Sequence, residues 1–288
     1  MIVVAPPTGL VGHQVLERVS GRAEPVRVIV RDPARLSPPV RERVELVQGS
    51  LTDHEVVTRA LAGADAVFWL VPPNPRAENV EAHILDFTRP LCEALTSQGV
   101  RRLVYISGLG RREARDAAGL AVDDLITSTG VSYRALRCPA FMDNLLRQVA
   151  SIKNQGMFFD MVSGDHKLPT CATRDIAAAA AGLLLDHSWS GQESVAILGP
   201  EDLSCNEMAQ IMSEVLERPI RYQQVPGETF QATLMQYGMS AAWARSLVDR
   251  MLRINQGLYN DEPRTSRSTT PTSFRQWCED VLRPAVLA

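Results

Sequence analysis

Short apolar runs alternate with segments of helical periodicity through the first half of the chain, and this alternation strongly constrains the fold. We expect strands at 2–5, 26–30, 44–47, 66–71, 103–106 and 133–136. Helices are expected between them at 12–19, 53–61, 77–98 and 117–129. Strands that alternate with helices form a parallel sheet covered on both faces. The pattern therefore predicts the α/β class, as a doubly wound parallel sheet that binds ligands beyond the carboxyl ends of its strands.

The regular alternation ends near residue 150. Beyond it the sequence predicts helices at 175–185, 204–216, 229–237, 241–252 and 274–282. Two further strands are expected at 195–198 and 220–225. Because helices dominate this part, we expect it to differ from the regular sheet that precedes it.

The first turn, PPTGLVG, has the outline of a nucleotide site with one change. Gly9 and Gly12 have the separation found in dinucleotide-binding turns, but Pro6 stands where the first glycine usually stands, and Pro7 follows. Proline removes an amide donor. The amides of the next helical turn nevertheless stay free to hold a diphosphate. Taken alone, the motif fits an ordinary strand–helix turn equally well.

Arg31 favours a phosphorylated dinucleotide. It directly follows the second predicted strand, and no acid occupies the last positions of that strand. An acid there would bind a ribose 2′-hydroxyl, whereas an arginine suits a 2′-phosphate. Arg35 is placed to assist, and the alternative for Arg31 is a solvated surface side chain. The predicted cofactor is NADP(H) rather than NAD.

Charge and cysteine spacing exclude several classes of protein. The formal net charge is -3, so no basic surplus indicates nucleic acid. No apolar stretch is long enough to span a bilayer, and the first apolar run ends at Pro6, which is typical of a strand rather than a signal peptide. The five cysteines are far apart and form no C-x-x-C pair. We expect a cytoplasmic protein with reduced thiols and no metal, nucleic-acid or membrane partner.

The order of several segments carries a family resemblance. TGLVG follows the first strand, VRVIVRDPARL covers the second, and GVRRLVYISGLG and VSYRALRCPAFMDNLL come later, before TRDIAAAAAGLLLD and PTSFRQW. Almost from end to end, the chain resembles the NmrA-like branch of the atypical short-chain dehydrogenases/reductases. The resemblance implies an NADP-binding Rossmann domain at 1–150 and a smaller, mostly helical substrate domain at 151–288. A part of the latter, around 171–200, would pack back on the sheet.

The resemblance also implies which residues face the cofactor. The diphosphate, 2′-phosphate and adenine would meet Thr8, Gly9, Leu10, Val11, Gly12, Arg31, Ser50 and Leu51. The ribose and nicotinamide would meet Val71, Pro72, Pro73, Ser107, Cys138, Pro139 and Phe141. The family usually has Pro-Gly where this chain has Cys138-Pro139.

The usual catalytic pair of the superfamily has no counterpart in the expected place. That pair is Tyr-x-x-x-Lys, in which the lysine lowers the pKa of the tyrosine. Residues 109–130 contain neither tyrosine nor lysine. Tyr105 is flanked by apolar residues and is expected in the core, while Tyr133 and Arg137 lie on a strand, where positions i and i+4 are about 13 Å apart. Ser107 or a water molecule is the remaining candidate for proton transfer.

Candidate substrate residues come from two places. Phe141, Met142 and Asn144 follow the sixth strand, where this architecture places its ligands. Phe230, Tyr237 and Trp243 belong to an apolar stripe nearer the C-terminus. Such a stripe suits a flat aromatic ligand, although plain helical core is the favoured interpretation for any single member.

Two functional hypotheses follow, with a third held open. The first is an NADPH-dependent reductase that transfers hydride to a quinone or related polycyclic aromatic, since a delocalised product anion needs no strong acid. The abundance of arginine over lysine is typical of GC-rich coding, a setting in which tailoring of an aromatic polyketide is one hypothesis. The second is a non-catalytic NADP-binding redox sensor that acts through a protein partner. A fold relic without cofactor is the third, and a homodimer is compatible with each.

Overall fold

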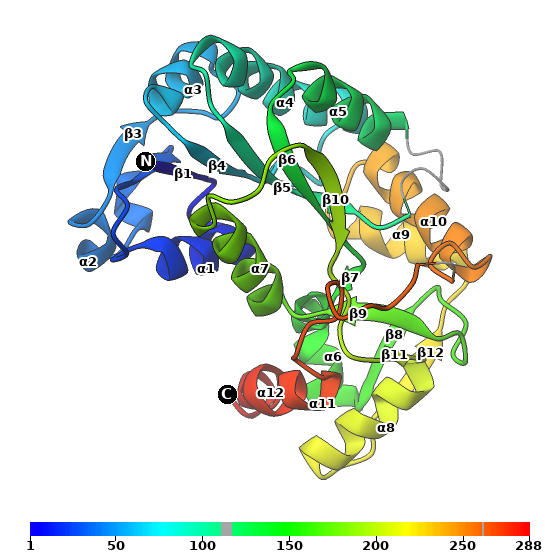
Figure 1. The fold of residues 1–288 in the computed structure, drawn as a ribbon. Helices are drawn as coiled ribbons and strands as arrows, with labels where there is room; N and C mark the ends of the chain where they lie inside the picture. The colour runs from blue at the N-terminus through cyan, green and yellow to red at the C-terminus, as the bar shows by residue number, and fades with distance from the viewer. Residues whose placement is uncertain (111–116, 261) are drawn as a thin grey trace.

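A seven-stranded parallel sheet forms the centre of the molecule (Figure 1). The computed structural model describes residues 1–110, 117–260 and 262–288. Across the sheet the strand order is β10-β6-β5-β4-β1-β2-β3. The strands are β1 Ile2–Ala5, β2 Val26–Val30, β3 Glu45–Gln48, β4 Ala66–Trp69, β5 Arg102–Gly108, β6 Ser132–Cys138 and β10 Gln192–Ala196. The order reverses direction between β1 and β4, which is where doubly wound sheets bind their ligands.

Helices cover both faces of this sheet. One face carries α3 His54–Leu61, α4 Val80–Ser97 and α5 Ala117–Ser128, which run along the top of Figure 1. The other face carries α1 Leu10–Val19 and α7 Thr173–Leu185, which pack against each other. Successive strand residues point to opposite faces. In β1, Val3 therefore joins the core under α3–α5, and Val4 joins the core under α1 and α7.

Local sequence explains the helix starts near the sheet. Asp53 caps α3, since its side chain accepts hydrogen bonds from the amides of Glu55 and Val56. Asn79 caps α4 by accepting from the amide of Ala82. Two short helical segments, η1 Pro33–Arg35 and α2 Pro38–Arg41, lie between β2 and β3.

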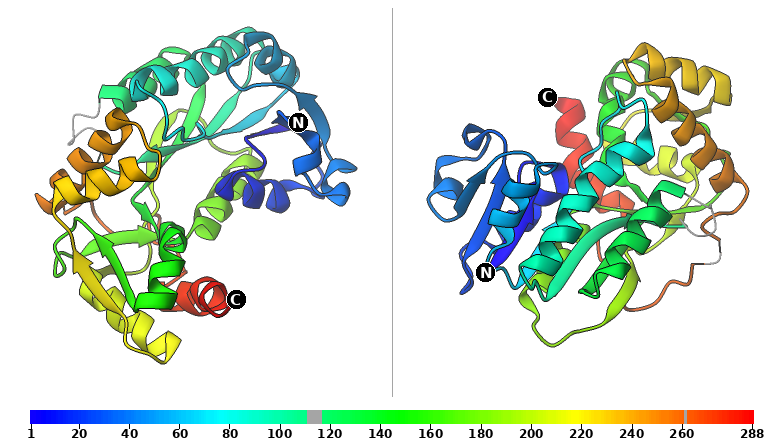
Figure 2. Two further views of the ribbon diagram at one scale, coloured as in Figure 1. Left: turned by 180° about the vertical axis from the view of Figure 1, so that it is seen from behind. Right: turned by 90° about the horizontal axis from the view of Figure 1, so that it is seen from above.

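The remaining chain forms a second lobe below the sheet (Figures 1 and 2). It holds a three-stranded sheet, ordered β11-β9-β7, and the pair β12-β8. Its strands are β7 Ala140–Phe141, β8 Met157–Asp160, β9 Leu168–Cys171, β11 Asp202–Leu203 and β12 Arg221–Gln224. Its helical segments are η2 Met142–Gln148, α6 Val149–Gln155, α8 Cys205–Leu216, α9 Gly227–Gln236, α10 Ala241–Asn255, α11 Phe274–Trp277, the π-helical segment η3 Cys278–Leu282 and α12 Arg283–Leu287.

The two lobes share chain segments rather than being joined once. The segment from α7 to β10 returns from the second lobe, and β10 pairs with β6 along 192–196. At the carboxyl end of β6, the chain crosses into β7 and η2. The elements that leave and re-enter the sheet therefore surround the carboxyl ends of β5 and β6.

The predicted fold class is confirmed, since the strands expected in the first half are present within two residues of their bounds. The helix expected at 274–282 is extended and changes type, because α11, η3 and α12 continue it to Leu287. None of the helices in the described ranges is both long and apolar enough to cross a membrane.

Candidate active site

The turn between β1 and α1 leaves a helix N-terminus open to a ligand. Gly9 is the N-cap of α1 and makes no side-chain cap, and the first turn of the helix contains no acid. Among the described hydrogen bonds, none uses the amides of Leu10, Val11 or Gly12. A Cβ atom on Gly9 would meet only the Pro6 ring, at 3.7 Å, so the space in front of this residue is unfilled by protein. Free amides and a helix dipole fit the diphosphate of a dinucleotide.

Pro6 fits this turn because its own amide is not needed there. The Ala5–Pro6 peptide bond is cis. Gly12 packs directly on the Pro6 carbonyl, the position in dinucleotide folds where a glycine lets helix and strand approach closely. The turn therefore keeps its packing glycine and its free amides, although proline has replaced its first glycine.

Arg31 stands at the carboxyl end of β2 beside the loop that follows β3. The Nε2 of Gln48 donates to the Arg31 carbonyl at 3.2 Å, and the Gly49 amide donates to Val30 at 3.1 Å, which holds the two loops together. Arg31 and Arg35 are exposed, and none of the described ion pairs or hydrogen bonds engages either guanidinium. Two free cations at this edge fit a 2′-phosphate.

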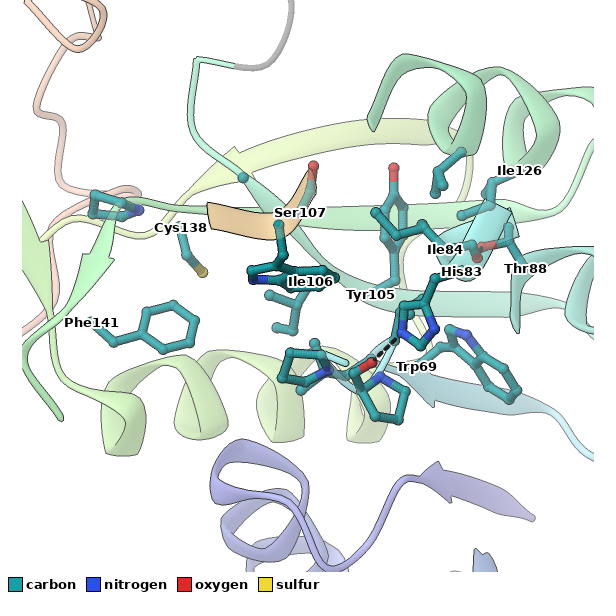
Figure 3. A pocket seen from close by; sticks show the side chains of 18 residues that line it. Trp69, His83, Ile84, Thr88, Tyr105, Ile106, Ser107, Ile126, Cys138 and Phe141 are labelled. Atoms are coloured by element: carbon teal, nitrogen blue, oxygen red, sulfur yellow. Dashed lines mark hydrogen bonds between the residues drawn. The ribbon is translucent and has the colours of Figure 1, made fainter. Parts of the chain in front are cut away.

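A cavity of about 300 Å³ opens at the carboxyl ends of β4, β5 and β6 (Figure 3). Trp69 and Pro72 border it from β4 and the loop that follows, and Ser107 borders it from β5. Its lining is Trp69, Leu70, Val71, Pro72, Pro73, His83, Ile84, Thr88, Tyr105, Ile106, Ser107, Gly108, Val122, Ile126, Cys138, Pro139, Phe141 and Trp243. Most of these side chains are apolar or aromatic, as in sites for flat organic ligands.

Some of the polar side chains of this cavity have hydrogen-bond partners within the protein, and others do not. The Thr88 hydroxyl donates to the Ile84 carbonyl at 2.8 Å, and the Tyr105 hydroxyl donates to Asp123 at 2.5 Å. The Nε2 of His83 lies 2.8 Å from the Pro72 carbonyl oxygen, drawn as the dashed line in Figure 3. Ser107 is 5 % exposed, and no hydrogen bond of its hydroxyl occurs among the described contacts.

Helix α10 forms one wall of the cavity and is tied down at both ends. At its start, the Ser240 hydroxyl donates to the Ala77 carbonyl at 2.6 Å, and the Ser240 amide donates to Pro75. At its end, Asn255 accepts from the Ser163 amide at 2.8 Å. Between these anchors Trp243 reaches His83, with ring centroids 6.1 Å apart and planes at 71°. The wall is therefore held in place without a ligand.

The cavity gathers many of the residues expected from the sequence. Those that line it are Val71, Pro72, Pro73, Ser107, Cys138, Pro139, Phe141 and Trp243. The residues expected at the diphosphate and adenine lie along the same edge of the sheet, in the β1–α1 turn, the first turn of α1 and the β3–α3 loop. Ser50 is partly buried there and Leu51 is buried.

Four expected substrate residues lie elsewhere. Met142 is 2 % exposed and packs in the core of the second lobe, because η2 turns it away from the sheet edge. Asn144 is exposed on η2. Phe230 lines a separate cavity of about 190 Å³, together with Phe159 and Val225. Tyr237 is 83 % exposed at the end of α9, so the apolar stripe is split between two sites and the solvent.

The structure adds cavity residues that the sequence did not indicate: Trp69, His83, Thr88, Tyr105, Val122 and Ile126. Tyr105 is core, as expected, and also borders the cavity. His83 stands in the first turns of α4, four residues after its cap. A histidine near the start of a helix that follows a sheet strand lies close to the strand ends, so its position in the sequence could have indicated a site residue.

The second tyrosine, Tyr133, is not paired with Arg137. The guanidinium of Arg137 makes two hydrogen bonds to Glu262, at 2.7 and 2.9 Å. The Tyr133 hydroxyl lies 3.3 Å from the Thr127 hydroxyl, and its ring meets Tyr105 edge to face. Both side chains thus have structural partners of their own.

Comparison with known proteins settles the family. The model of the NmrA-like family matches residues 1–256. The chain belongs to this family. It is 32% identical to a (4-alkanoyl-5-oxo-2,5-dihydrofuran-3-yl)methyl phosphate reductase of Streptomyces griseus, across 82% of this chain and 80% of that protein. It is 24% identical to quinone oxidoreductase 2 of Escherichia coli, across 92% of each.

Solved structures agree on the fold. The NADPH complex of an Escherichia coli NADPH-dependent quinone oxidoreductase superposes with a TM-score of 0.79 at 22% identity, covering 96% of this chain and 98% of that one. A Citrobacter triphenylmethane reductase complexed with NADP(H) gives a TM-score of 0.80 at 18% identity, covering 99% and 100%. The family prediction is confirmed, and the prediction of an oxidoreductase that uses NADP(H) is confirmed at the level of this family.

Proposed function

We propose that this protein is an NADPH-dependent reductase of a small, flat, electrophilic acceptor, with quinones as the leading class. The observation that carries the proposal is the placement of the aromatic cavity. It opens at the carboxyl ends of β4–β6, on the same sheet edge as the uncapped N-terminus of α1 and the free guanidinium of Arg31. A dinucleotide that spans these points would bring its nicotinamide end to the cavity.

In this proposal the residues of the chain orient the cofactor and the acceptor and keep water out of the cavity. When bound, the cofactor would supply a hydride. The amides that start α1 would hold the diphosphate, and Arg31 would hold the 2′-phosphate. Phe141 and the Val71–Pro73 segment would confine the nicotinamide end, since they line the cavity. Trp243 offers a flat surface against which an acceptor ring would pack, and the apolar lining would exclude water.

The face that α5 turns to the cavity favours an easily reduced acceptor. Its two lining residues, Val122 and Ile126, are one turn apart and apolar. The nearest phenol, Tyr105, already donates its proton to Asp123. Reduction of a simple ketone needs a strong acid at the new alkoxide, whereas a quinone delocalises its charge. The cavity volume of about 300 Å³ is at the lower end for small-molecule sites, so we expect acceptors of one or two rings.

The test is NADPH oxidation with a panel of acceptors. It would hold one- to three-ring quinones, an azo dye and a (4-alkanoyl-5-oxo-2,5-dihydrofuran-3-yl)methyl phosphate, because the relatives include an NAD(P)H azoreductase of Xenophilus azovorans and the Streptomyces griseus enzyme. Saturable turnover of quinones supports the proposal. Selective turnover of the dihydrofuranone would move the substrate class to unsaturated lactones, and the three-ring members test the aromatic polyketide hypothesis.

The sensor hypothesis predicts a different pattern. A redox sensor would bind NADPH tightly, in a calorimetric titration, and leave every acceptor unreduced. A fold relic would show no saturable binding of either nicotinamide cofactor. The preformed cavity beside the open helix end supports the reductase over both.

A further inference from the structure

His83 borders the cavity, and only one of its two ring nitrogens has a hydrogen-bond partner among the described contacts. Its Nε2 lies 2.8 Å from the Pro72 carbonyl oxygen. A carbonyl oxygen only accepts hydrogen bonds, so Nε2 carries a proton and donates it. The neutral ring therefore keeps its lone pair on Nδ1, for which the described contacts contain no partner. Protonation of Nδ1 would turn this atom into a donor while the bond to Pro72 stays intact.

The surroundings of the ring favour such a role. His83 borders the cavity between Trp243 of α10 and Phe87 of its own helix, with ring centroids at 6.1 and 5.0 Å. The ring contacts recorded for the described residues involve the Pro72 carbonyl and these two aromatics, and no carboxylate or cation. The other ionisable side chains of the cavity lining are Tyr105 and Cys138. An imidazole can carry a donor proton on each ring nitrogen at once, and histidine is the side chain most often used as a general acid.

The other cavity groups are poorer proton donors. Tyr105 is committed to Asp123, and Thr88 to the Ile84 carbonyl. The Ser107 hydroxyl has no described partner that would replace a proton it gave away. The neighbouring Cys171 thiol lies outside the lining, and its hydrogen bond to Cys138, together with burial, raises its pKa well above the usual value. His83 thus combines an anchored ring with an available nitrogen.

We propose that His83 is the acid that protonates the acceptor oxygen, an inference that rests on the proposed reductase function. A quinone that gains a hydride becomes the hydroquinone monoanion. Transfer of one proton from Nδ1 of the imidazolium to that oxyanion completes the hydroquinone and leaves neutral His83. A proton from solvent then restores the imidazolium. The sum is quinone, NADPH and one proton giving hydroquinone and NADP⁺, which balances in atoms and charge.

The decisive experiment compares His83→Gln with wild type on two quinones of matched size. Glutamine places an amide nitrogen near the former Nε2, which preserves donation to Pro72 but supplies no titrating proton. Tetrachloro-1,4-benzoquinone gives a weakly basic product oxygen, and tetramethyl-1,4-benzoquinone gives a strongly basic one. We expect kcat for the tetramethyl compound to fall about 100-fold, within the range typical of a general acid, and kcat for the tetrachloro compound to fall less than about fivefold.

The pH profile gives a second, independent readout. Wild-type kcat with the tetramethyl compound should decline as rising pH removes the proton from the acid, and the variant should lose that ionisation. NADPH affinity should be the same in both proteins, which shows that the variant is folded. His54→Gln is the matched control, because His54 is exposed on α3 and its recorded ion-pair partner is Glu93, at 2.8 Å. This control should keep both the rate and the profile.

The outcomes separate the two proposals. If wild type reduces both quinones but His83→Gln slows them by the same factor with an unchanged profile, His83 is a positioning residue and the inference fails while the reductase stands. If wild type binds NADPH and reduces neither quinone nor any other acceptor of the panel, the reductase proposal fails and takes the role of His83 with it.

Discussion

Gly12 packs so closely on the Pro6 carbonyl that a Cβ atom on Gly12 would lie 1.9 Å from that oxygen. Gly9, three residues earlier, faces open space instead, where the nearest described atom to such a Cβ is 3.7 Å away. The two glycines of the turn therefore have different reasons to be glycine. Gly12 serves the packing of α1 on β1, and Gly9 is required only by a ligand that approaches the main chain.

The substitution Gly12→Ala should destabilise the protein itself. Backbone must shift to admit the methyl group, at a cost of about 1–3 kcal/mol typical of overpacking. Urea unfolding would measure this loss. Gly182→Ala is the control, because Gly182 lies in helix α7 with nothing within 4 Å of its Cβ position. That change should instead raise the free energy of unfolding, by about 0.5–1 kcal/mol.

The substitution Gly9→Ala should separate binding from stability. The N-cap backbone, at φ -80°, accepts alanine without strain, so stability should fall only by about 1 kcal/mol, because alanine is a poorer N-cap than glycine. A methyl group in front of the helix would displace a bound diphosphate, and we expect the dissociation constant of NADPH to rise at least about tenfold, or 1.4 kcal/mol. Calorimetric titration measures the NADPH dissociation constants of the wild type and of the variant. Unaltered NADPH affinity would contradict a cofactor that passes over this turn.

The substitution Arg31→Ala should discriminate between the two nicotinamide cofactors. Loss of a charged hydrogen bond costs about 1.5–3 kcal/mol, so NADPH binding should weaken by about 10- to 150-fold while NADH binding changes little. Arg41→Ala, at an exposed arginine of α2, should affect neither. Equal losses of NADPH and NADH affinity would remove the reason to assign the 2′-phosphate to Arg31.

The substitution Trp243→Ala should widen the acceptor range. Removing the indole enlarges the cavity beside His83, so kcat/KM for a three-ring quinone should rise at least about tenfold relative to a one-ring quinone, equal to 1.4 kcal/mol of transition-state discrimination. The NADPH dissociation constant should not change. Tyr237→Ala, at a side chain that is 83 % exposed, should leave the ratio of the two quinones as it is. A shift in this second variant would return Tyr237 to the substrate site.

Stability should fall in alkaline solution because of buried thiols. Burial raises the pKa of Cys92, Cys205 and Cys278 from 9.0 to about 12. Above pH 9 the unfolded chain releases these protons and the folded chain keeps them. The stabilisation is therefore complete below pH 9 and is lost as pH rises toward about 12, by about 2 kcal/mol per thiol at pH 10.5. Urea midpoints from pH 8 to 10.5 test this, and Cys92→Ala should show a smaller decline.

The sheet could be predicted from sequence because its strands are short, apolar on both faces and separated by helix caps. Runs such as 2–5 and 26–30 have few alternatives, since every residue of β1 is buried and only Arg27 of β2 is partly exposed. The elements after β6 were harder. Helix α6, with only Ile152 buried, carries little apolar periodicity, and β7 and β11 are two residues each.

Site residues that lie at strand ends could be predicted from the sequence. Those placed by the packing of helices distant in sequence could not. Ser107 and Cys138 lie at the carboxyl ends of β5 and β6, and Pro72 lies just after β4, so topology alone brings them together. His83 joins them only through the turn that sets the start of α4, and Tyr237 is excluded only by the end of α9. The proposed domain boundary near residue 150, like the homodimer, stays a prediction.

Because Ser240 and Asn255 anchor α10 to the loop after β4 and to Ser163, and not to the β1–α1 turn or to Arg31, we expect the residues that α10 turns to the cavity to vary without changing the proposed diphosphate and 2′-phosphate contacts. One substitution at such a position would change which electron acceptors fit the cavity and leave the affinity for NADPH as it is. On this fold, a new acceptor specificity would therefore require no change in the loops and helix start proposed to bind the nucleotide.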